Sequence, residues 1–197
     1  MPRRYTLGKR AGQKEATRQR ILDAAAAIYQ ERGVSQTTIP EVARRADVAP
    51  GTVLNHFASA DALARAVVDE VVASLRLPSD QVFAGLTDVP DRVRRLAHEL
   101  LAFYERSEPW YLVYAREPAG VAAWADAEAS FYADFDRLIR IALGPLAMEE
   151  TNVAIVSTML GAGVYSALRG RKLSTPALEA LVIEVLSPWL ERKVAVQ

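Results

Sequence analysis

Hydrophobic residues along this chain of 197 residues recur at the three- and four-residue spacing of amphipathic helices almost throughout. Alternation of the kind that marks a strand is absent, and Gly, Pro and Ser punctuate the apolar stretches. The pattern therefore predicts an all-α chain of about nine helices. The expected segments are 14–32, 38–46, 50–57, 60–76, 90–106, 109–115, 119–143, 149–169 and 176–192.

Local signals mark the ends of several of these helices. Gly33 follows the first apolar stripe and suits the left-handed residue that often ends a helix. Thr38 and Glu41 have the spacing of a capping box, in which two side chains satisfy free backbone N–H groups. Ser59 can cap the fourth helix. These signals place helix starts close to residues 38 and 60.

Residues 38–57 have the layout of a helix-turn-helix. Residues 47–49, between the two short helices, leave room only for a tight turn, and Pro50 suits the first position of the second helix. Such a corner can place its second helix in the major groove of DNA. Helix pairs with short turns also occur in proteins without a DNA role, so the spacing alone leaves both interpretations open.

The residues in and around this corner favour the DNA-binding interpretation. Residues 17–67 closely resemble the DNA-binding domain of the TetR family of regulators. The matching positions, in order, are the opening Thr-Arg-x-x-Ile-Leu-Asp-Ala-Ala, Arg32-Gly33, Thr37-Thr38, Val42-Ala43, Ala46, Val48, Gly51-Thr52, His56-Phe57, Ser59 and Ala62-Leu63. The rest of the chain resembles the family only in length and helical character.

The resemblance implies a transcriptional regulator, most commonly a repressor. It implies a homodimer whose two heads bind a palindromic operator in double-stranded DNA, and a small-molecule effector that releases the DNA. Two identical heads need two half-sites, and an effector can act only by binding two conformations unequally. The expected organisation is a basic arm and DNA-binding domain over 1–60. A ligand-binding and dimerisation domain follows over 61–197, with a connecting helix over 61–76.

Carried over residue by residue, the resemblance suggests a set of DNA contacts. Thr38 can cap its helix and meet a phosphate, and Gly51 permits close approach of the backbone. Asn55 can bond an adenine through two hydrogen bonds, although it can equally be a solvent-exposed helix residue. His56 stands at the family's phosphate-contacting position. The expected DNA-binding residues are Thr37, Thr38, Gly51, Thr52, Leu54, Asn55 and His56.

Some positions depart from the family's usual pattern. Leu54 stands where tyrosine is usual and Ala60 where lysine is common, which removes two phosphate contacts. Leu54 can touch a thymine methyl group instead. Asp47 takes a turn position usually held by glycine, and aspartate tolerates left-handed backbone better than most residues. Ala49 lacks the capping oxygen of the usual serine.

Charge is distributed unevenly although the formal net charge is zero. Residues 1–57 contain ten Lys or Arg and five Asp or Glu, and the remainder carries the opposite excess. Residues 1–13 are expected to form a flexible basic arm that supplements the lost phosphate contacts; the alternative is a solvated tail. The arm contains Arg3, Arg4, Lys9 and Arg10.

Aromatic side chains are concentrated in the C-terminal part. Nine of the fifteen Phe, Trp and Tyr residues fall between residues 103 and 135. Any one of them can be ordinary core, but as a group they suit a cavity for a small, largely apolar or aromatic ligand. The expected ligand-binding residues are Phe103, Trp110, Tyr111, Tyr114, Trp124, Phe131, Phe135 and Met159.

Two apolar segments near the C-terminus predict a dimer interface. Residues 151–168 are uncharged, with Gly161-Ala162-Gly163 allowing close helix approach, and residues 176–192 have a broad apolar face. The alternative is the core of a monomer. The uncharged segment is near the lower length of a membrane-spanning helix. Its Thr, Asn and Ser residues favour a buried or interface helix, so no membrane partner is expected.

Other function classes find little support. The chain has no cysteine and two histidines, and no nucleophile elbow, P-loop, dinucleotide-binding glycine run or metal-ligand cluster occurs. We expect no catalytic residue, no cofactor and no metal site, and the lack of cysteine fits the cytoplasm. A DNA-binding architectural protein without an effector is the stronger alternative. Release of DNA by a ligand would distinguish the two.

Deletion of residues 1–12 tests whether the basic arm reaches DNA. If its side chains neutralise phosphates, the deletion weakens binding and lowers the slope of log K against log salt, by about 0.9 for each lost contact. Fluorescence anisotropy with a labelled duplex over a salt series measures both quantities. A slope equal to that of the full chain would contradict the contact.

Overall fold

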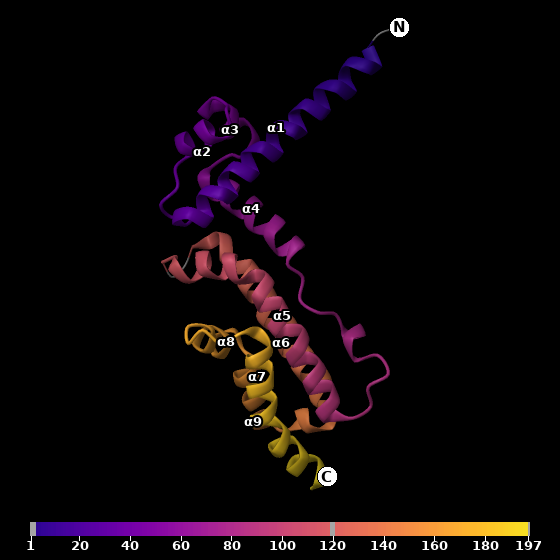
Figure 1. Cartoon of the computed structure of the whole chain (residues 1–197). Coiled ribbons are helices and arrows are strands. Elements are labelled where there is room, and N and C mark those ends of the chain that lie inside the picture. The colour runs from indigo at the N-terminus through magenta and orange to yellow at the C-terminus, as the bar shows by residue number, and fades with distance from the viewer. Residues whose placement is uncertain (1–2, 119–120, 197) are drawn as a thin grey trace. The chain divides into compact units, whose positions relative to one another are not determined.

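The computed structural model describes residues 3–118 and 121–196, with side chains from residue 10 onwards. Within this part the chain forms nine α-helices, two short 3-10 helices and no strand (Figure 1). The all-α prediction is therefore confirmed. The chain divides into two compact units. Unit 1 is Met1–Ser74 with Pro109–Ala127, and unit 2 is Leu75–Glu108 with Glu128–Gln197.

Unit 1 is built around α1 (Arg3–Arg32), which packs against α2 (Ile39–Arg45), α3 (Pro50–His56) and α4 (Ala60–Ser74) (Figure 1). One face of α1 is buried there, as expected for a helix with a single apolar stripe. That face comprises Ile21, Leu22, Ala25, Ile28 and Tyr29. The segment 109–127 completes the same core, through Val113, Ala123 and Trp124.

Helix α1 begins earlier than the sequence pattern indicated. It starts at Arg3 rather than near residue 14, so the predicted flexible arm over 1–13 is helical from residue 3. No proline interrupts this stretch and most of its residues are good helix formers. The helix therefore continues although residues 10–16 are exposed. The side chains of Arg3, Arg4 and Lys9 lie outside the part that the structure describes.

The caps predicted in unit 1 are present. Gly33 has a φ of +93°, and its N–H closes the last turn of α1. Ser59 Oγ accepts a hydrogen bond from the N–H of Ala62 (3.1 Å) and caps α4. The capping box begins α2: the Glu41 carboxylate accepts from the N–H of Thr38 (3.0 Å) and from its hydroxyl (2.8 Å). Local hydrogen bonds thus define both ends of the corner.

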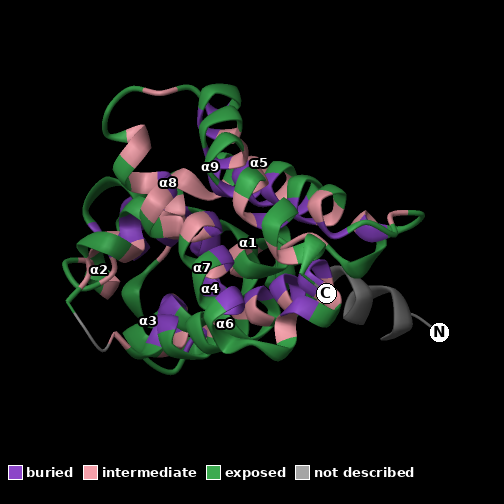
Figure 2. Cartoon of the chain, turned by 90° about the horizontal axis from the view of Figure 1, so that it is seen from below, coloured by how far each residue is buried: buried purple, intermediate pink, exposed green. Residues whose placement is uncertain are grey.

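Unit 2 takes its helices from the rest of the chain. They are η1 (Asp80–Phe83), α5 (Val89–Arg116), α6 (Ala122–Leu143), η2 (Gly144–Met148), α7 (Glu150–Leu160), α8 (Ala162–Arg169) and α9 (Thr175–Ala195). Helices α5 and α6 belong to unit 2 only in part, because their residues 109–116 and 122–127 fall in unit 1. Buried positions recur as stripes along the helices, with exposed positions between them (Figure 2). The fully buried large side chains of this unit are Leu96, Leu100, Leu138, Ile139, Leu143, Leu160, Leu178, Leu186 and Leu190.

Helix α5 runs through Pro109, where the pattern predicted a break between 90–106 and 109–115. Proline removes one helical hydrogen bond and crowds the preceding turn. Buried positions nevertheless continue on both sides of it, at Tyr104 and at Val113. Packing on both sides outweighs the local cost, so the prediction of two helices is wrong here.

The segment 149–169, predicted as one helix, is two. Gly161 has extended backbone (φ −75°, ψ 154°) between α7 and α8, and a Cβ on it would lie 2.9 Å from the Ser157 carbonyl oxygen. A helix end leaves carbonyl groups without intrahelical donors. The Tyr104 hydroxyl donates to one of them, the carbonyl of Leu160 (3.0 Å). The glycine that was expected to admit a neighbouring helix is instead the site of the break.

Residues 150–169 are also, within the described part of the chain, the one stretch long and apolar enough to cross a membrane by length and composition. The break at Gly161 interrupts this stretch. Leu160 and Tyr165, on either side of the break, pack into the core of unit 2. Core packing accounts for part of the apolar composition, since 28% of this stretch is buried.

Replacing Glu41 with glutamine tests the capping box. Hydrogen bonds from Thr38, together with the Arg32 guanidinium 2.9 Å away, lower the pKa of Glu41 below its ordinary value. A carboxyl whose pKa is lower in the folded state stabilises the fold above its unfolded-state pKa, and this contribution is lost as the pH falls through the folded-state pKa. We therefore expect Glu41→Gln to lower the urea midpoint at neutral pH, and the difference from the parent protein to shrink in acid.

Urea denaturation followed by circular dichroism over a pH series measures this difference. Glu31→Gln is the matched control, because Glu31 forms an ion pair with the exposed Arg45 and exposed pairs contribute little to stability. A Glu41→Gln difference that is unchanged in acid would contradict the charged capping box.

Candidate nucleic-acid interface

The corner between α2 and α3 turns at Asp47. A φ of +53° puts this residue in the left-handed region, as its position in the turn predicted. The N–H of Val48 then donates to the carbonyl of Ala43 (3.0 Å) and closes the turn. Ala49 precedes α3 without a side-chain cap, and Pro50 occupies the first turn of the helix. The chain therefore reverses within three residues and begins α3 at once.

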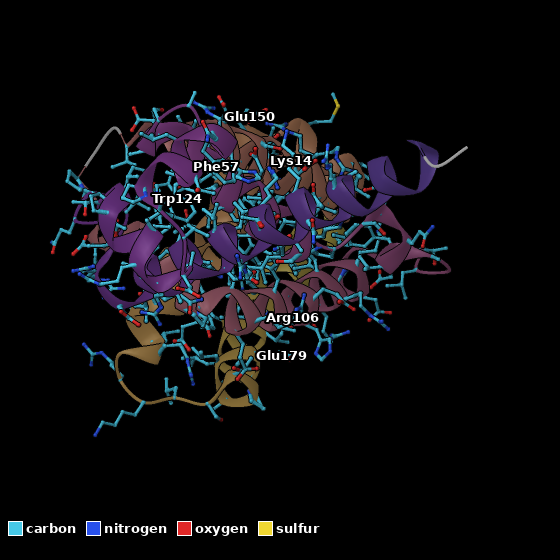
Figure 3. All side chains as sticks on the ribbon, turned by 90° about the horizontal axis from the view of Figure 1, so that it is seen from above. Lys14, Phe57, Arg106, Trp124, Glu150 and Glu179 are labelled. Atoms are coloured by element: carbon cyan, nitrogen blue, oxygen red, sulfur yellow. The ribbon has the colours of Figure 1, made fainter. Side chains whose placement is uncertain are left out.

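The inward face of α3 is anchored in the core of unit 1. Val53 is fully buried and Phe57, labelled in Figure 3, is 5% exposed. The guanidinium of Arg18 on α1 lies over the Phe57 ring, 5.1 Å from its centre, in the geometry of a cation–π contact. Sequence reasoning did not find Arg18. These contacts hold α3 on a rigid base, which a recognition helix needs.

The outward face of α3 carries most of the residues expected to bind DNA. Gly51, Leu54 and Asn55 are exposed, while Thr52 and His56 are half-buried. The Leu54 side chain is 48% exposed, so an apolar group is accessible to solvent next to the amide of Asn55 in the sequence. The structure thus brings five of the seven expected residues onto one short helix, with acceptors, donors and an apolar surface together.

Thr37 and Thr38 lie apart from that face, before α2, and their hydroxyl protons are already engaged. Thr37 Oγ1 donates to the carbonyl of Gly33 (2.7 Å), and the Thr38 hydroxyl donates to Glu41. A hydroxyl has only one proton to donate, and phosphate oxygens only accept. In this structure both threonines therefore serve the turn and the helix cap.

Unit 1 also exposes basic side chains. Duplex DNA carries about one negative charge per 1.7 Å of its axis, so exposed cations favour association with it. The side chains are Arg10, Lys14 (labelled in Figure 3), Arg20 and Arg44. Sequence reasoning included Arg10 but passed over Arg44, whose place in the last turn of α2 was the available signal.

The aromatic residues expected to bind a ligand divide between the two units. Trp110, Tyr114 and Trp124 pack in the core of unit 1, where the rings of Tyr114 and Trp124 meet edge to face at 5.8 Å. Tyr111 is half-buried in the same segment. Trp124 Nε1 is buried and has no hydrogen-bond partner within the described part of the chain. These side chains therefore help to build unit 1.

The other four expected ligand-binding residues lie in unit 2. Phe131 stacks with Phe103 (6.0 Å between ring centres) and with Phe135 (5.9 Å). Met159 packs against the same core. No group of three or more His, Cys, Asp or Glu side chains among the residues described is placed to hold a metal ion. The chemistry that this cluster offers is apolar contact.

Comparison with known proteins identifies the N-terminal part. A family model described as bacterial regulatory proteins of the tetR family matches residues 21–67. The A-factor receptor protein of Streptomyces griseus is 37% identical over 60 residues, which are 30% of this chain and 22% of that protein. The chain thus matches only about a fifth of the length of this relative.

Similarity to solved structures extends over nearly the whole chain. A TetR-like transcriptional regulator from Rhodococcus sp. RHA1 has a TM-score of 0.63 at 18% identity, covering 92% of this chain and 97% of that one. NalD, the secondary repressor of the MexAB-OprM multidrug efflux pump in Pseudomonas aeruginosa, has a TM-score of 0.62 at 21% identity, covering 90% and 96%. At such identities the likeness shows the fold. Residues 21–67 thus match the model of the tetR family of bacterial regulatory proteins, and the chain has the fold of TetR-like transcriptional regulators.

Proposed function

We propose that the protein is a cytoplasmic homodimeric repressor that binds a palindromic operator and releases it when a small molecule binds in unit 2. The observation that supports DNA binding is the outward face of α3, which is exposed while the inward face packs in the core of unit 1. Residues 1–60 contribute the arm and the helix-turn-helix, and residues 61–197 contribute effector binding and dimerisation. Residues 109–127 additionally complete the core of unit 1.

The exposed side chains of α3 favour recognition of A·T pairs. The major groove presents N6 and N7 of adenine to an amide side chain, and the C5 methyl of thymine to an apolar one. Asn55 supplies the amide and Leu54 the apolar surface, one residue apart on the same helix. Thr52 adds a hydroxyl and a methyl group for a neighbouring base edge. His56 and Arg44 are the proposed phosphate contacts.

Selection of bound duplexes from a random DNA pool, with the full-length protein, tests this proposal. Two identical heads on a dimer should recover an inverted repeat whose half-sites are separated by about one helical turn or a multiple of it. Recovery of a single half-site, or of no preferred sequence, would contradict the palindromic operator.

The same selection tests the role of Asn55. Asn55→Ala should weaken binding to the recovered operator by about 1–3 kcal/mol and relax the preference at one adenine in each half-site. Arg44→Ala is the control, because loss of a phosphate contact weakens binding to all sequences alike. An unchanged base preference in Asn55→Ala would contradict base reading by this residue.

The proposed dimer interface uses an exposed apolar strip on α9. Leu181 (39% exposed) and Val185 (53% exposed) are four residues apart, in line with the exposed Ala177 and Pro188. Ile155 on α7 is also 40% exposed. Such a strip is unfavourable in water, and a second copy related by twofold symmetry covers it with the same residues.

Val185→Lys tests this interface. Twofold symmetry brings the introduced charge close to its own copy in an apolar contact, so the dimer dissociation constant should rise about 100-fold or more. Analytical ultracentrifugation over a concentration series measures it. Ala180→Lys is the matched control, because Ala180 is exposed on α9 but lies on a different side from the strip. Equal dissociation constants for the two variants would exclude α9 from the interface.

The proposed effector site is the cluster of Phe103, Phe131, Phe135 and Met159 in unit 2. Two of these side chains, Phe103 and Phe135, are each 7% exposed, so a ligand among them would be shielded from water. Their stacked rings suit an apolar or aromatic ligand. One relative is named a receptor for A-factor and one structural neighbour a repressor of a multidrug efflux pump, which fits control by a small molecule.

A further inference from the structure

A carboxylate from the end of α5 binds the turn between α1 and α2. Both oxygens of Glu117 accept backbone hydrogen bonds there: Oε1 from the N–H of Val34, and Oε2 from the N–H of Ser35 (3.1 Å). The partners are 82 and 83 positions apart in the sequence, and all of them lie within unit 1. Bonds from uncharged donors to a charged acceptor are among the stronger hydrogen bonds in proteins.

The turn is shaped to receive this carboxylate. Gly33 has a φ of +93°, and a left-handed residue in a turn can direct successive N–H groups toward one point, which forms a site for an anion. A Cβ on Gly33 would lie 2.5 Å from Oε1 of Glu117, so the close approach also requires glycine. Gly33 therefore ends α1 and leaves room for the carboxylate at the same time.

The neighbouring Arg116 secures the end of α1 from the same segment. Its Nη2 donates to the carbonyl of Gln30 (3.1 Å), in the last turn of the helix. A cation at a helix C-terminus also interacts favourably with the helix dipole. Glu117 thus accepts hydrogen bonds from the N–H groups that follow α1, and Arg116 donates one to a carbonyl in its last turn.

The charge of Glu117 is also felt in the core beneath this turn. Tyr29 on α1 is 3% exposed. Burial, reinforced by the negative charges of Asp61 and Glu117, raises the pKa of Tyr29 above its ordinary value. The tyrosine therefore stays neutral under the turn.

Hydrogen bonds connect the turn directly to the start of α2. The Thr37 hydroxyl donates to the carbonyl of Gly33 (2.7 Å), and the N–H of Thr37 donates to the carbonyl of Val34 (3.1 Å). Thr38, the next residue, is the N-cap of α2. The turn that Glu117 contacts therefore leads directly into the N-cap of α2, and the tight turn at Asp47 joins α2 to α3.

We propose that Glu117 is a positioning residue for DNA recognition. Its carboxylate holds residues 33–38 in the one conformation that presents the outward face of α3 correctly. Residues 109–127 are then a working part of the DNA-binding unit, although they lie far from the helix-turn-helix in sequence. The inference rests on operator binding as proposed above.

Glu117→Gln and Asp126→Asn form a matched pair of variants for the test. The glutamine is isosteric, but its NH2 group cannot accept a hydrogen bond, so one of the two backbone N–H groups loses its acceptor. Asp126 lies in the same segment and forms an ion pair with Arg65, and its side chain is 82% exposed. Both changes remove one negative charge, so the general attraction of the protein for DNA changes alike in both.

The measurement is the dissociation constant for the selected duplex, at a temperature where circular dichroism shows both variants fully folded. Glu117→Gln should bind about tenfold or more weakly than Asp126→Asn, with the same salt slope because no phosphate contact is lost. The amides of Val34 and Ser35 should also exchange hydrogen faster. A merely structural role would lower the melting temperature and leave the dissociation constant of the folded protein unchanged.

Equal affinities of the two folded variants would overturn the proposal. Glu117→Asp keeps the charge on a shorter side chain and should bind with intermediate affinity; it replaces the glutamine variant in the comparison if that variant does not fold. If the parent protein itself selects no preferred duplex, the proposed operator function fails instead. In that case amide exchange at Val34 and Ser35, with binding to a random-sequence duplex, still decides whether Glu117 holds the turn.

Discussion

The buried face of α1 is the constraint on which the DNA-binding unit depends. Helices of seven residues, such as α2 and α3, are too short to be stable alone in water. They persist because Val42 and Val53 pack on the apolar stripe of α1, and Leu63 of α4 and Val113 of α5 complete the cover. Only with its inner side held in this way can α3 leave Leu54 and Asn55 in the open. The proposed recognition face thus relies on the residues buried beneath it.

Turns and helix ends in this protein were predictable where the residues that satisfy their backbone groups lie close by in the sequence. The left-handed Asp47 and the Ser59 cap each involve neighbours along the chain, so residue type and spacing were sufficient. The backbone groups at other turns and helix ends bond to side chains that are distant in the sequence. Glu117 serves amides more than 80 positions earlier, and Tyr104 serves the carbonyl at the break after Leu160. Spacing carries no signal for such pairs.

Helix continuity could not be predicted from single residues either. Proline at 109 stays within a helix and glycine at 161 ends one, the reverse of the expectation at each position. Packing on both sides keeps Pro109 within its helix, whereas Gly161 takes an extended conformation and the carbonyl before it is bonded by the distant Tyr104. Hydrophobic periodicity reports neither of these factors. The number of helices nevertheless agrees, because one expected break is missing and one unexpected break is present.

Parts of the candidate sites followed from the sequence and parts did not. The outward face of α3 was predictable because a buried Val53 and Phe57 fix which positions remain exposed on a helix. The aromatic cluster was recognised from composition, which gives the number of rings but not the core each one enters. Trp124 packs in the core of unit 1, whereas Phe131 packs in the core of unit 2.

The interrupted course of unit 1 along the chain has a consequence for protein engineering. A chimeric regulator made by joining residues 1–74 to the sensing part of another protein would carry the entire helix-turn-helix. It would nevertheless leave behind Val113 and Trp124, which close the core, and the carboxylate that occupies the turn after Gly33. The unit that can be exchanged is therefore assembled from two stretches of the chain. A transplanted helix-turn-helix needs a host whose own helices supply both the missing core side chains and the carboxylate at the turn.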